Sequence, residues 1–197
     1  VLRARFTPDG QNIVYSAAWD GRPTEIFLSR LDASGVRAVG LSGADLMAVN
    51  GRGELLILLK PSQWTSTSAF SGTLAMASLD GGTPREILAR ARGADFAPDG
   101  QALAVMYQDG EGGPFYLDYP LGTRLLAPPG GDPRIPRISP QGDQVAFLYY
   151  TSSRTDSTST RGKGSLAVVD RAGKWRDLAT KLEIKDDDLA WSRDGRE

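Results

Sequence analysis

Short apolar runs recur along the chain, and each one follows a turn-forming sequence. Four of them cover residues 13–19, 55–59, 102–107 and 145–150. Their apolar positions are consecutive rather than alternate and are rich in β-branched and aromatic residues, which is typical of β-strands packed on both faces. Nowhere do apolar residues follow a helical i, i+3, i+4, i+7 spacing over any length. The pattern therefore predicts an all-β chain.

The turn before each run is a repeated motif, Phe-Thr-Pro-Asp-Gly at residues 6–10 and related sequences later. Its copies end at Gly10, Gly53, Gly100, Gly142 and Gly195, so successive copies are 43, 47, 42 and 53 residues apart. Proline presets a φ near −65°, aspartate bonds to the local backbone and glycine accepts a positive φ, so the motif predicts a tight turn between two strands. The spacing is that of a repeat of roughly 40 to 50 residues.

A second series of turns keeps its place inside every repeat. We expect third strands at 25–31, 73–79, 114–119 and 165–170, and fourth strands at 37–39, 85–88, 124–127 and 176–179. Between them lie glycine-bearing turns at Gly35, Gly82, Gly122 and Gly173, which are 47, 40 and 51 residues apart. Each repeat thus holds four short antiparallel strands in one fixed order.

This organisation predicts an all-β fold, a β-propeller of four-stranded antiparallel blades, here a partial ring of four blades and the first strand of a fifth. The expected blades are 1–42, 43–91, 92–132 and 133–183, with the start of the fifth at 184–197. A β-sandwich is the alternative, but the constant order of two turn series favours a propeller. Because a cut ring exposes apolar blade faces, we expect the remaining blades, six in total, in the same polypeptide.

Charge and composition narrow the classes of partner. The net charge is −1 and the isoelectric point about 5.6, which argues against nucleic acid as a partner. The longest apolar run, 55–59, is far shorter than the roughly 20 residues of a membrane-spanning helix, so we expect no membrane insertion by this segment. No cysteine and no histidine occur, which removes the usual nucleophile–base pairs and zinc sites. We expect neither catalysis nor a cofactor.

Three sequence features carry a family resemblance. The Phe-x-Pro-Asp-Gly turn, Ile-Val-Tyr-Ser at 13–16 and Asp-Gly-Gly at 80–82 resemble the WD40-like repeats of TolB-type propellers. Residues 15–21, 41–49 and 164–170 more narrowly resemble the C-terminal propellers of bacterial eukaryotic-like serine/threonine kinases. That resemblance implies a ligand- or protein-binding sensor domain on the extracytoplasmic side of a membrane-anchored kinase. A cytoplasmic location stays open.

Two other functions remain open beside the kinase sensor. One is a TolB-like periplasmic interaction protein. The other is the gating propeller of a prolyl-peptidase-type serine peptidase, which would need a Gly-x-Ser-x-Gly elbow and a histidine outside these residues.

The candidate binding face lies where the long connections 60–72 and 150–164 leave the sheets, because function concentrates on loops carried by a rigid scaffold. Its candidate residues are Trp64, Phe70, Arg134, Arg154, Asp156 and Asp188. Trp64 and Phe70 either anchor a partner or cover the neighbouring blade. Eight of the ten residues at 151–160 are serine or threonine, which indicates a solvated hairpin end or, alternatively, a phosphate-accepting or ligand-ordered loop.

Two groups of charged residues deserve separate hypotheses. Three consecutive aspartates at 186–188 form either a solvated acidic turn or a calcium site, although no EF-hand spacing is present. Arg5, Asp95 and Arg137 each precede the first residue of a turn motif, on the first strand of a repeat. They either line a central channel or form ion pairs between blades.

Overall fold

The computed structural model describes residues 1–32, 34–63, 70–128, 131–150, 162–184 and 188–195. These residues form fifteen β-strands and no helix, and none of them could therefore cross a membrane as a long apolar helix. The chain divides into two compact units, Val1–Ala91 and Arg92–Glu197, which are described separately. The all-β prediction is confirmed.

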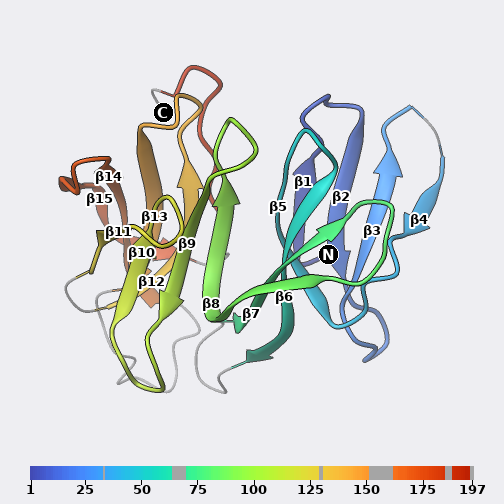
Figure 1. Cartoon of the computed structure of the whole chain (residues 1–197), viewed down its shortest axis with the longest axis horizontal. Coiled ribbons are helices and arrows are strands. Elements are labelled where there is room, and N and C mark those ends of the chain that lie inside the picture. Colours follow the sequence, from blue (N-terminus) through green and yellow to red (C-terminus); the bar gives the residue numbers. More distant parts are fainter. Residues whose placement is uncertain (33, 64–69, 129–130, 151–161, 185–187, 196–197) are drawn as a thin grey trace. The chain divides into compact units, whose positions relative to one another are not determined.

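The first unit holds two four-stranded repeats (Figure 1). Repeat 1 consists of β1 (Arg3–Phe6), β2 (Asn12–Ala17), β3 (Glu25–Arg30) and β4 (Val36–Ala38). Repeat 2 consists of β5 (Ala44–Val49), β6 (Glu54–Gln63), β7 (Phe70–Ser78) and the first part of β8 (Arg85–Phe96). Consecutive strands pair antiparallel throughout.

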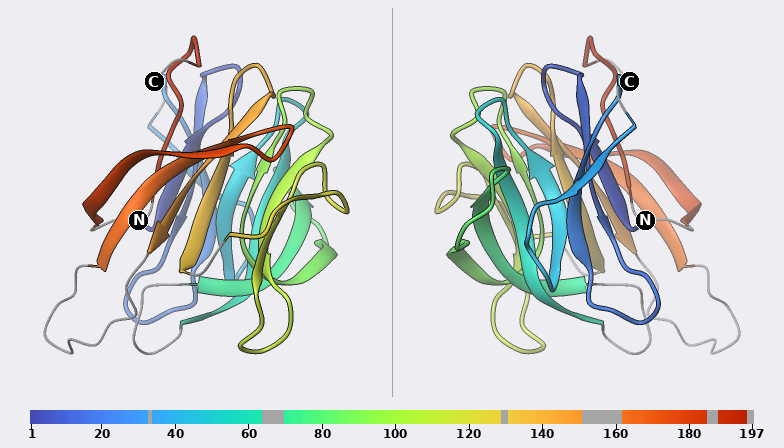
Figure 2. Two further views of the ribbon diagram at one scale, coloured as in Figure 1. Left: turned by 90° about the vertical axis from the view of Figure 1, so that its left-hand side faces the viewer. Right: turned by 90° about the vertical axis from the view of Figure 1, so that its right-hand side faces the viewer.

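The second unit repeats this arrangement (Figure 2). Repeat 3 consists of the later part of β8 with β9 (Leu103–Gln108), β10 (Phe115–Asp118) and β11 (Arg124–Leu126). Repeat 4 consists of β12 (Asp132–Ile138), β13 (Gln144–Tyr150), β14 (Gly162–Asp170) and β15 (Trp175–Ile184). Every repeat is therefore an antiparallel sheet whose strands follow chain order, as the two series of turns predicted.

The turn motif has the geometry that its residues predict. In the first copy the N–H of Gly10 donates to the carbonyl of Thr7 at 2.8 Å, and Gly10 has a φ of 68°. In the last copy the N–H of Gly195 donates to Ser192 in the same way at 2.9 Å. We expected a first strand near residues 188–195, but these residues form no strand ladder with any other described residue. In the other repeats the first strand pairs with the second strand, which follows the turn.

The hairpin of repeat 2 differs from the predicted long loop at 60–72. β6 continues to Gln63 and β7 begins at Phe70, so these two residues are paired strand residues. The register shifts at Lys60 and Pro61, where Lys60 adopts a φ of 47°. Proline has no N–H to give to a ladder, and a bulge lets the hairpin continue past it. The fourth strand of repeat 2, the part of β8 that pairs with β7 over residues 85–91, is longer than the predicted 85–88, and β15 is longer than the predicted 176–179.

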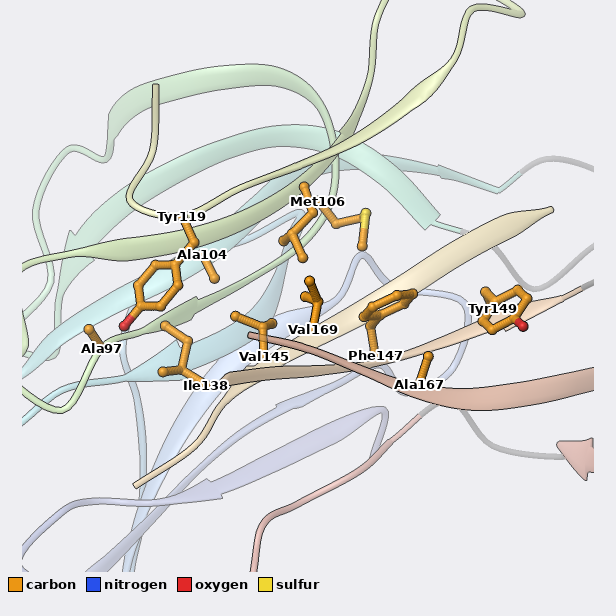
Figure 3. Close-up of a cluster of buried hydrophobic side chains, with 11 residues drawn as sticks. Ala97, Ala104, Met106, Tyr119, Ile138, Val145, Phe147, Tyr149, Ala167 and Val169 are labelled. Carbon is orange, nitrogen blue, oxygen red and sulfur yellow. The ribbon is translucent and has the colours of Figure 1, made fainter. Parts of the chain in front are cut away.

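Each unit has its own buried core between its two sheets. In the first unit, Val14 and Ile26 of repeat 1 cluster with Leu55 and Ile57 of repeat 2. In the second unit, Met106 and Leu117 of repeat 3 cluster with Val145 and Phe147 of repeat 4, as Figure 3 shows for most of these side chains. Sheet-on-sheet burial thus joins two repeats into one unit.

We expect Phe147→Ala to lower the free energy of unfolding by about 3 to 5 kcal/mol, because the substitution leaves a cavity between two sheets. Phe147 is fully buried in the second core, whereas Leu178 of β15 is 45% exposed. The matched control Leu178→Ala should therefore change the stability by less than about 1 kcal/mol in urea titrations. Equal losses for the two variants would contradict this core assignment.

The stability should also fall at alkaline pH through Tyr149. Burial raises the pKa of the Tyr149 hydroxyl, and the hydrogen bond that it donates to Asp177 at 2.8 Å raises the pKa further. In the unfolded chain a tyrosine ionises near pH 10. The free energy contributed by Tyr149 is therefore complete below about pH 9 and is lost as the pH rises past 10. Unfolding curves of Tyr149→Phe should show a shallower alkaline loss than the unchanged protein; parallel losses would contradict it.

Candidate functional site

Charged residues occupy one register position on the first strands of three repeats. The three residues are Arg3 of β1, Asp45 of β5 and Arg134 of β12. Each lies opposite the fourth residue of the apolar run on the second strand of its repeat, counted from residue 13, 55 or 145. Those opposite residues are Ser16, Leu58 and Leu148. The position is near the end of the sheet where the second strand connects to the third, which we call the loop end.

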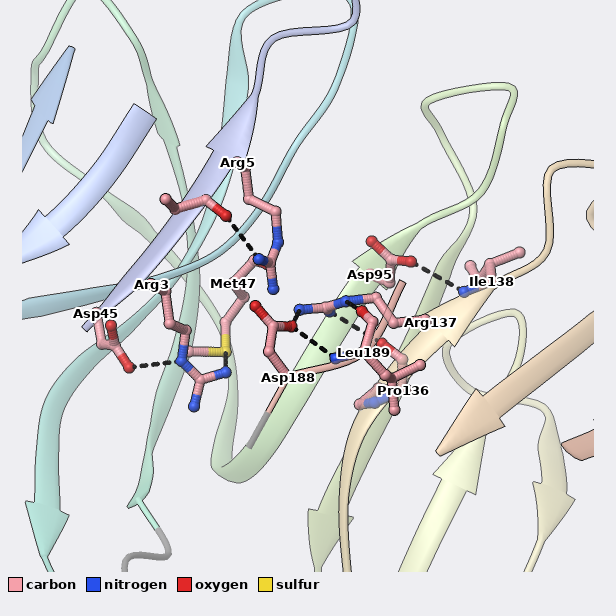
Figure 4. A network of polar contacts seen from close by, with 11 residues as sticks. Arg3, Arg5, Asp45, Met47, Asp95, Pro136, Arg137, Ile138, Asp188 and Leu189 are labelled. Carbon is pink, nitrogen blue, oxygen red and sulfur yellow. Dashed lines mark hydrogen bonds and ion pairs between the residues drawn. The ribbon is translucent and has the colours of Figure 1, made fainter. Parts of the chain in front are cut away.

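In the first unit this position joins the two repeats by an ion pair (Figure 4). The Arg3 guanidinium lies 3.1 Å from the Asp45 carboxylate, which also accepts a 2.6 Å hydrogen bond from the Ser16 hydroxyl. Asp45 is only 2% exposed. Two residues closer to the turn on β1, the Arg5 guanidinium donates to the carbonyl of Met47 at 3.3 Å. Both arginines of β1 thus bind the first strand of repeat 2.

In the second unit one carboxylate lies between two buried arginines. Asp132 forms ion pairs with Arg92 and with Arg134. The Arg92 guanidinium lies 5.1 Å from the centre of the Phe115 ring, and the Arg134 guanidinium lies 4.4 Å from that of Tyr150. The Asp132 side chain is 25% exposed, whereas those of the two arginines are nearly inaccessible. Paired charges and aromatic faces therefore form a rigid cluster at the loop end.

Arg137 links repeat 4 to the segment that follows β15 (Figure 4). Its guanidinium lies 3.2 Å from the Asp188 carboxylate and donates to the carbonyl of Leu189 at 3.3 Å. Asp95 of β8 accepts a 2.9 Å hydrogen bond from the backbone N–H of Ile138. Of the predicted residues, Arg5 and Asp95 thus bond to the first strand of the next repeat, β5 and β12. Arg137 bonds to residues 188–189, which follow β15. That they line a channel stays a prediction.

The structure places only part of the predicted binding face. Arg134 is buried against Asp132, and Asp188 is half exposed beside Arg137. Phe70 lies in β7, while Trp64, Arg154 and Asp156 lie outside the described residues. Asp186 and Asp187 of the suggested calcium site also lie outside them, and no group of three potential metal ligands converges within the described part of the chain.

The sequence analysis named five charged members of these networks: Arg5, Asp95, Arg134, Arg137 and Asp188. It missed the other members. The missed charged residues are Arg3, Asp45, Arg92 and Asp132. A signal was present, because an arginine or aspartate among the apolar residues of a buried strand requires a charged partner. The pairing itself depends on which strands become neighbours.

Comparisons with solved structures identify the fold. Over 90% of this chain, a structure described as a putative TolB from Agrobacterium tumefaciens superimposes with a TM-score of 0.67 and 17% identity. TolB from Acinetobacter baumannii matches 92% of the chain with a TM-score of 0.68 and 19% identity. Prolyl oligopeptidase B from Galerina marginata matches 98% with a TM-score of 0.54 and 15% identity. The chain has the β-propeller fold that these TolB structures share.

These similarities establish the fold alone, since all identities are low. The chain spans 65% and 44% of the two TolB chains and 29% of the peptidase. No protein-family model and no curated protein sequence matches it. The predicted fold class and TolB-type resemblance are therefore confirmed, and the resemblance to kinase-associated propellers stays a prediction.

The ion pair of the first unit should contribute strongly to stability. We expect Asp45→Asn to lower the free energy of unfolding by about 3 kcal/mol, because it leaves the Arg3 guanidinium buried beside an uncharged amide. The matched control is Asp32→Asn, which breaks the 2.7 Å pair with Arg30 between side chains that are 62% and 68% exposed. That change should leave the stability nearly unchanged, because water and salt screen an exposed pair. Similar losses for both variants in urea titrations would contradict the structural role of Asp45.

Proposed function

We propose that the chain is a non-catalytic interaction domain that binds a protein ligand at the loop ends of its repeats, within a larger bacterial protein. The supporting fold is that of TolB and of peptidase propellers, which places loops from successive sheets at common ends. The sequence contains no histidine and no cysteine, which also favours a binding function over a catalytic one.

The cluster at the loop end of the second unit carries this proposal. Asp132 is held in place by two buried guanidiniums, yet its side chain is 25% exposed. The rings of Phe115 and Tyr150 are partly exposed beside it. A fixed acceptor with neighbouring aromatic faces suits a peptide backbone N–H or a cationic side chain, and the aromatic rings supply apolar contact area.

For the whole protein we favour the sensor of a membrane-anchored serine/threonine kinase, with the propeller on the extracytoplasmic side. Support comes from the sequence segments 15–21, 41–49 and 164–170. A TolB-like periplasmic interaction protein is supported by the fold, and a peptidase propeller by the 98% coverage in the match to prolyl oligopeptidase B. Kinase motifs, a secretory signal or a nucleophile elbow in the same polypeptide would distinguish the three.

The binding proposal can be tested with a phage library of random peptides selected on the purified chain. Selected peptides should bind in calorimetry, and Phe115→Ala should weaken their affinity by about tenfold or more, as expected for an aromatic anchor. Thermal unfolding of the variant shows that the fold is retained.

Leu178→Ala is the matched control, because Leu178 is exposed on the edge strand β15 of the same unit and away from the cluster. Its affinity for the selected peptides should be unchanged. Failure to enrich peptides, or peptides that bind Phe115→Ala and the unchanged chain equally, would refute the proposed site.

A further inference from the structure

The arginine that joins two repeats lies at different positions in the two units. In repeat 3, Gly93 occupies the position of Arg3 in repeat 1, because each lies three residues before the phenylalanine of its turn motif. The arginine of the second unit is the preceding residue, Arg92. First strands run from the loop end toward the turn motif, so Arg92 is one residue nearer the loop end than Arg3 is.

The aspartate of the pair is displaced in the same direction. Arg134 in repeat 4 occupies the position of Asp45 in repeat 2, opposite the fourth residue of the apolar run. The aspartate of the second unit is Asp132, which is two residues nearer the loop end. The side chain of Asp45 is 2% exposed and that of Asp132 is 25% exposed. The aspartate between repeats is therefore buried in the first unit and partly exposed in the second.

Gly93 lets β8 approach β12 closely at this point. A Cβ atom at residue 93 would lie 2.9 Å from Cδ of Pro136 and 3.3 Å from the backbone nitrogen of Ile135. Gly93 has no positive φ, so alanine could adopt its backbone conformation and only the space is missing. Glycine inside a strand often marks such a close approach of another backbone. The bulge of β12 thus packs directly on β8.

The bulge of β12 is strained at this contact. Ile135 has a φ of 53°, which is rare for a β-branched residue, and the proline that follows it favours an extended conformation instead. The bulge of β5 lies at the corresponding place in repeat 2, yet Leu46 and Met47 have no positive φ. The bulge alone therefore does not require this strain. Strain of this kind persists where the surrounding contacts impose it, and it is found at ligand-binding sites.

We propose that the contact of Gly93 with Ile135 and Pro136, here called the bulge contact, positions the loop-end cluster of the second unit for its ligand. All three residues are buried, so they act through the cluster and do not touch the ligand. The inference deepens the function proposed above and rests on it. The ion pair between repeats then serves packing alone in the first unit, and both packing and binding in the second.

The bulge contact acts on the cluster because it adjoins the cluster in both strands. Arg92 precedes Gly93 in β8, and Arg134 precedes Ile135 in β12. Both guanidiniums bond to Asp132, so the separation of the two strands determines whether one carboxylate reaches both. A shift of about 1 Å is enough to weaken a site that depends on fixed geometry.

Gly93→Ala tests the bulge contact with the peptides selected on the unchanged chain. The added methyl group collides with Cδ of Pro136 and must separate the strands, so calorimetry should show an affinity about tenfold lower. Pro136→Ala removes that Cδ atom. In the Pro136→Ala background, Gly93→Ala should lower the affinity by less than about twofold, because the two residues no longer collide.

Gly35→Ala is the matched control, because Gly35 has no positive φ and a Cβ atom there meets nothing within 4 Å. Its affinity should equal that of the unchanged chain. An equal loss from Gly93→Ala with and without Pro136→Ala would overturn the proposal, as would no loss at all. If Gly93→Ala alone does not fold, the double variant should fold and bind like Pro136→Ala, and a double variant that also unfolds would overturn the proposal.

A second measurement needs no ligand. Carbodiimide coupling of glycine methyl ester, followed by mass spectrometry, reports the accessibility of each carboxylate. Gly93→Ala should speed the reaction of Asp132, because a guanidinium moves away from it, and should leave that of Asp45 unchanged. Unchanged reactivity of Asp132 would overturn the positioning role. Faster reaction of Asp132 without any selected peptide would support the positioning role and refute the proposed function.

Discussion

The structure depends on burial of one apolar sheet face by the sheet of a neighbouring repeat. A single four-stranded repeat cannot cover both faces of its own sheet, and the consecutive apolar positions of β6 and β13 leave neither face polar. The two cores, around Leu55 in the first unit and Phe147 in the second, are made by residues of two repeats each. The smallest self-covering element in this chain is therefore a pair of sheets rather than one sheet.

Charges on the first strands are placed within this apolar packing. A buried arginine or aspartate is costly unless a partner of opposite charge is fixed beside it, so pairs such as Arg3 with Asp45 constrain how two sheets may be aligned. At the loop end of the second unit the same device holds Asp132 next to two aromatic rings. Under the proposed function, structural pairing and ligand binding use the same residues, because the alignment of the sheets fixes the geometry of the Asp132 carboxylate.

Much of the fold could be predicted from the sequence because its signals are local. A Pro-Asp-Gly turn fixes a hairpin by its own dihedral preferences, and a repeat of such turns fixes strand order. The extended hairpin at Gln63 and Phe70 could not be predicted, since a bulge at Pro61 lets pairing resume beyond a residue that normally ends a strand.

The candidate site was less predictable than the fold. Arg137 and Asp188 are 51 residues apart in sequence, and Arg92 and Asp132 are 40 residues apart, so only the folded chain brings them together. Residue type indicated that Arg5, Asp95 and Arg137 needed partners, but not which ones. Trp64, Arg154 and Asp156 of the candidate binding face lie outside the described residues, so their part in it stays a prediction.

The central claim, that neighbouring repeats stabilise each other through their apolar faces, is tested most directly by a double-mutant cycle across one interface. Met106 and Phe147 belong to facing sheets in the same buried cluster (Figure 3). If the account is right, Met106→Ala and Phe147→Ala should be coupled by about 0.5 to 3 kcal/mol in the free energy of unfolding. Strictly additive losses would show that the two sheets are stabilised independently and would contradict it.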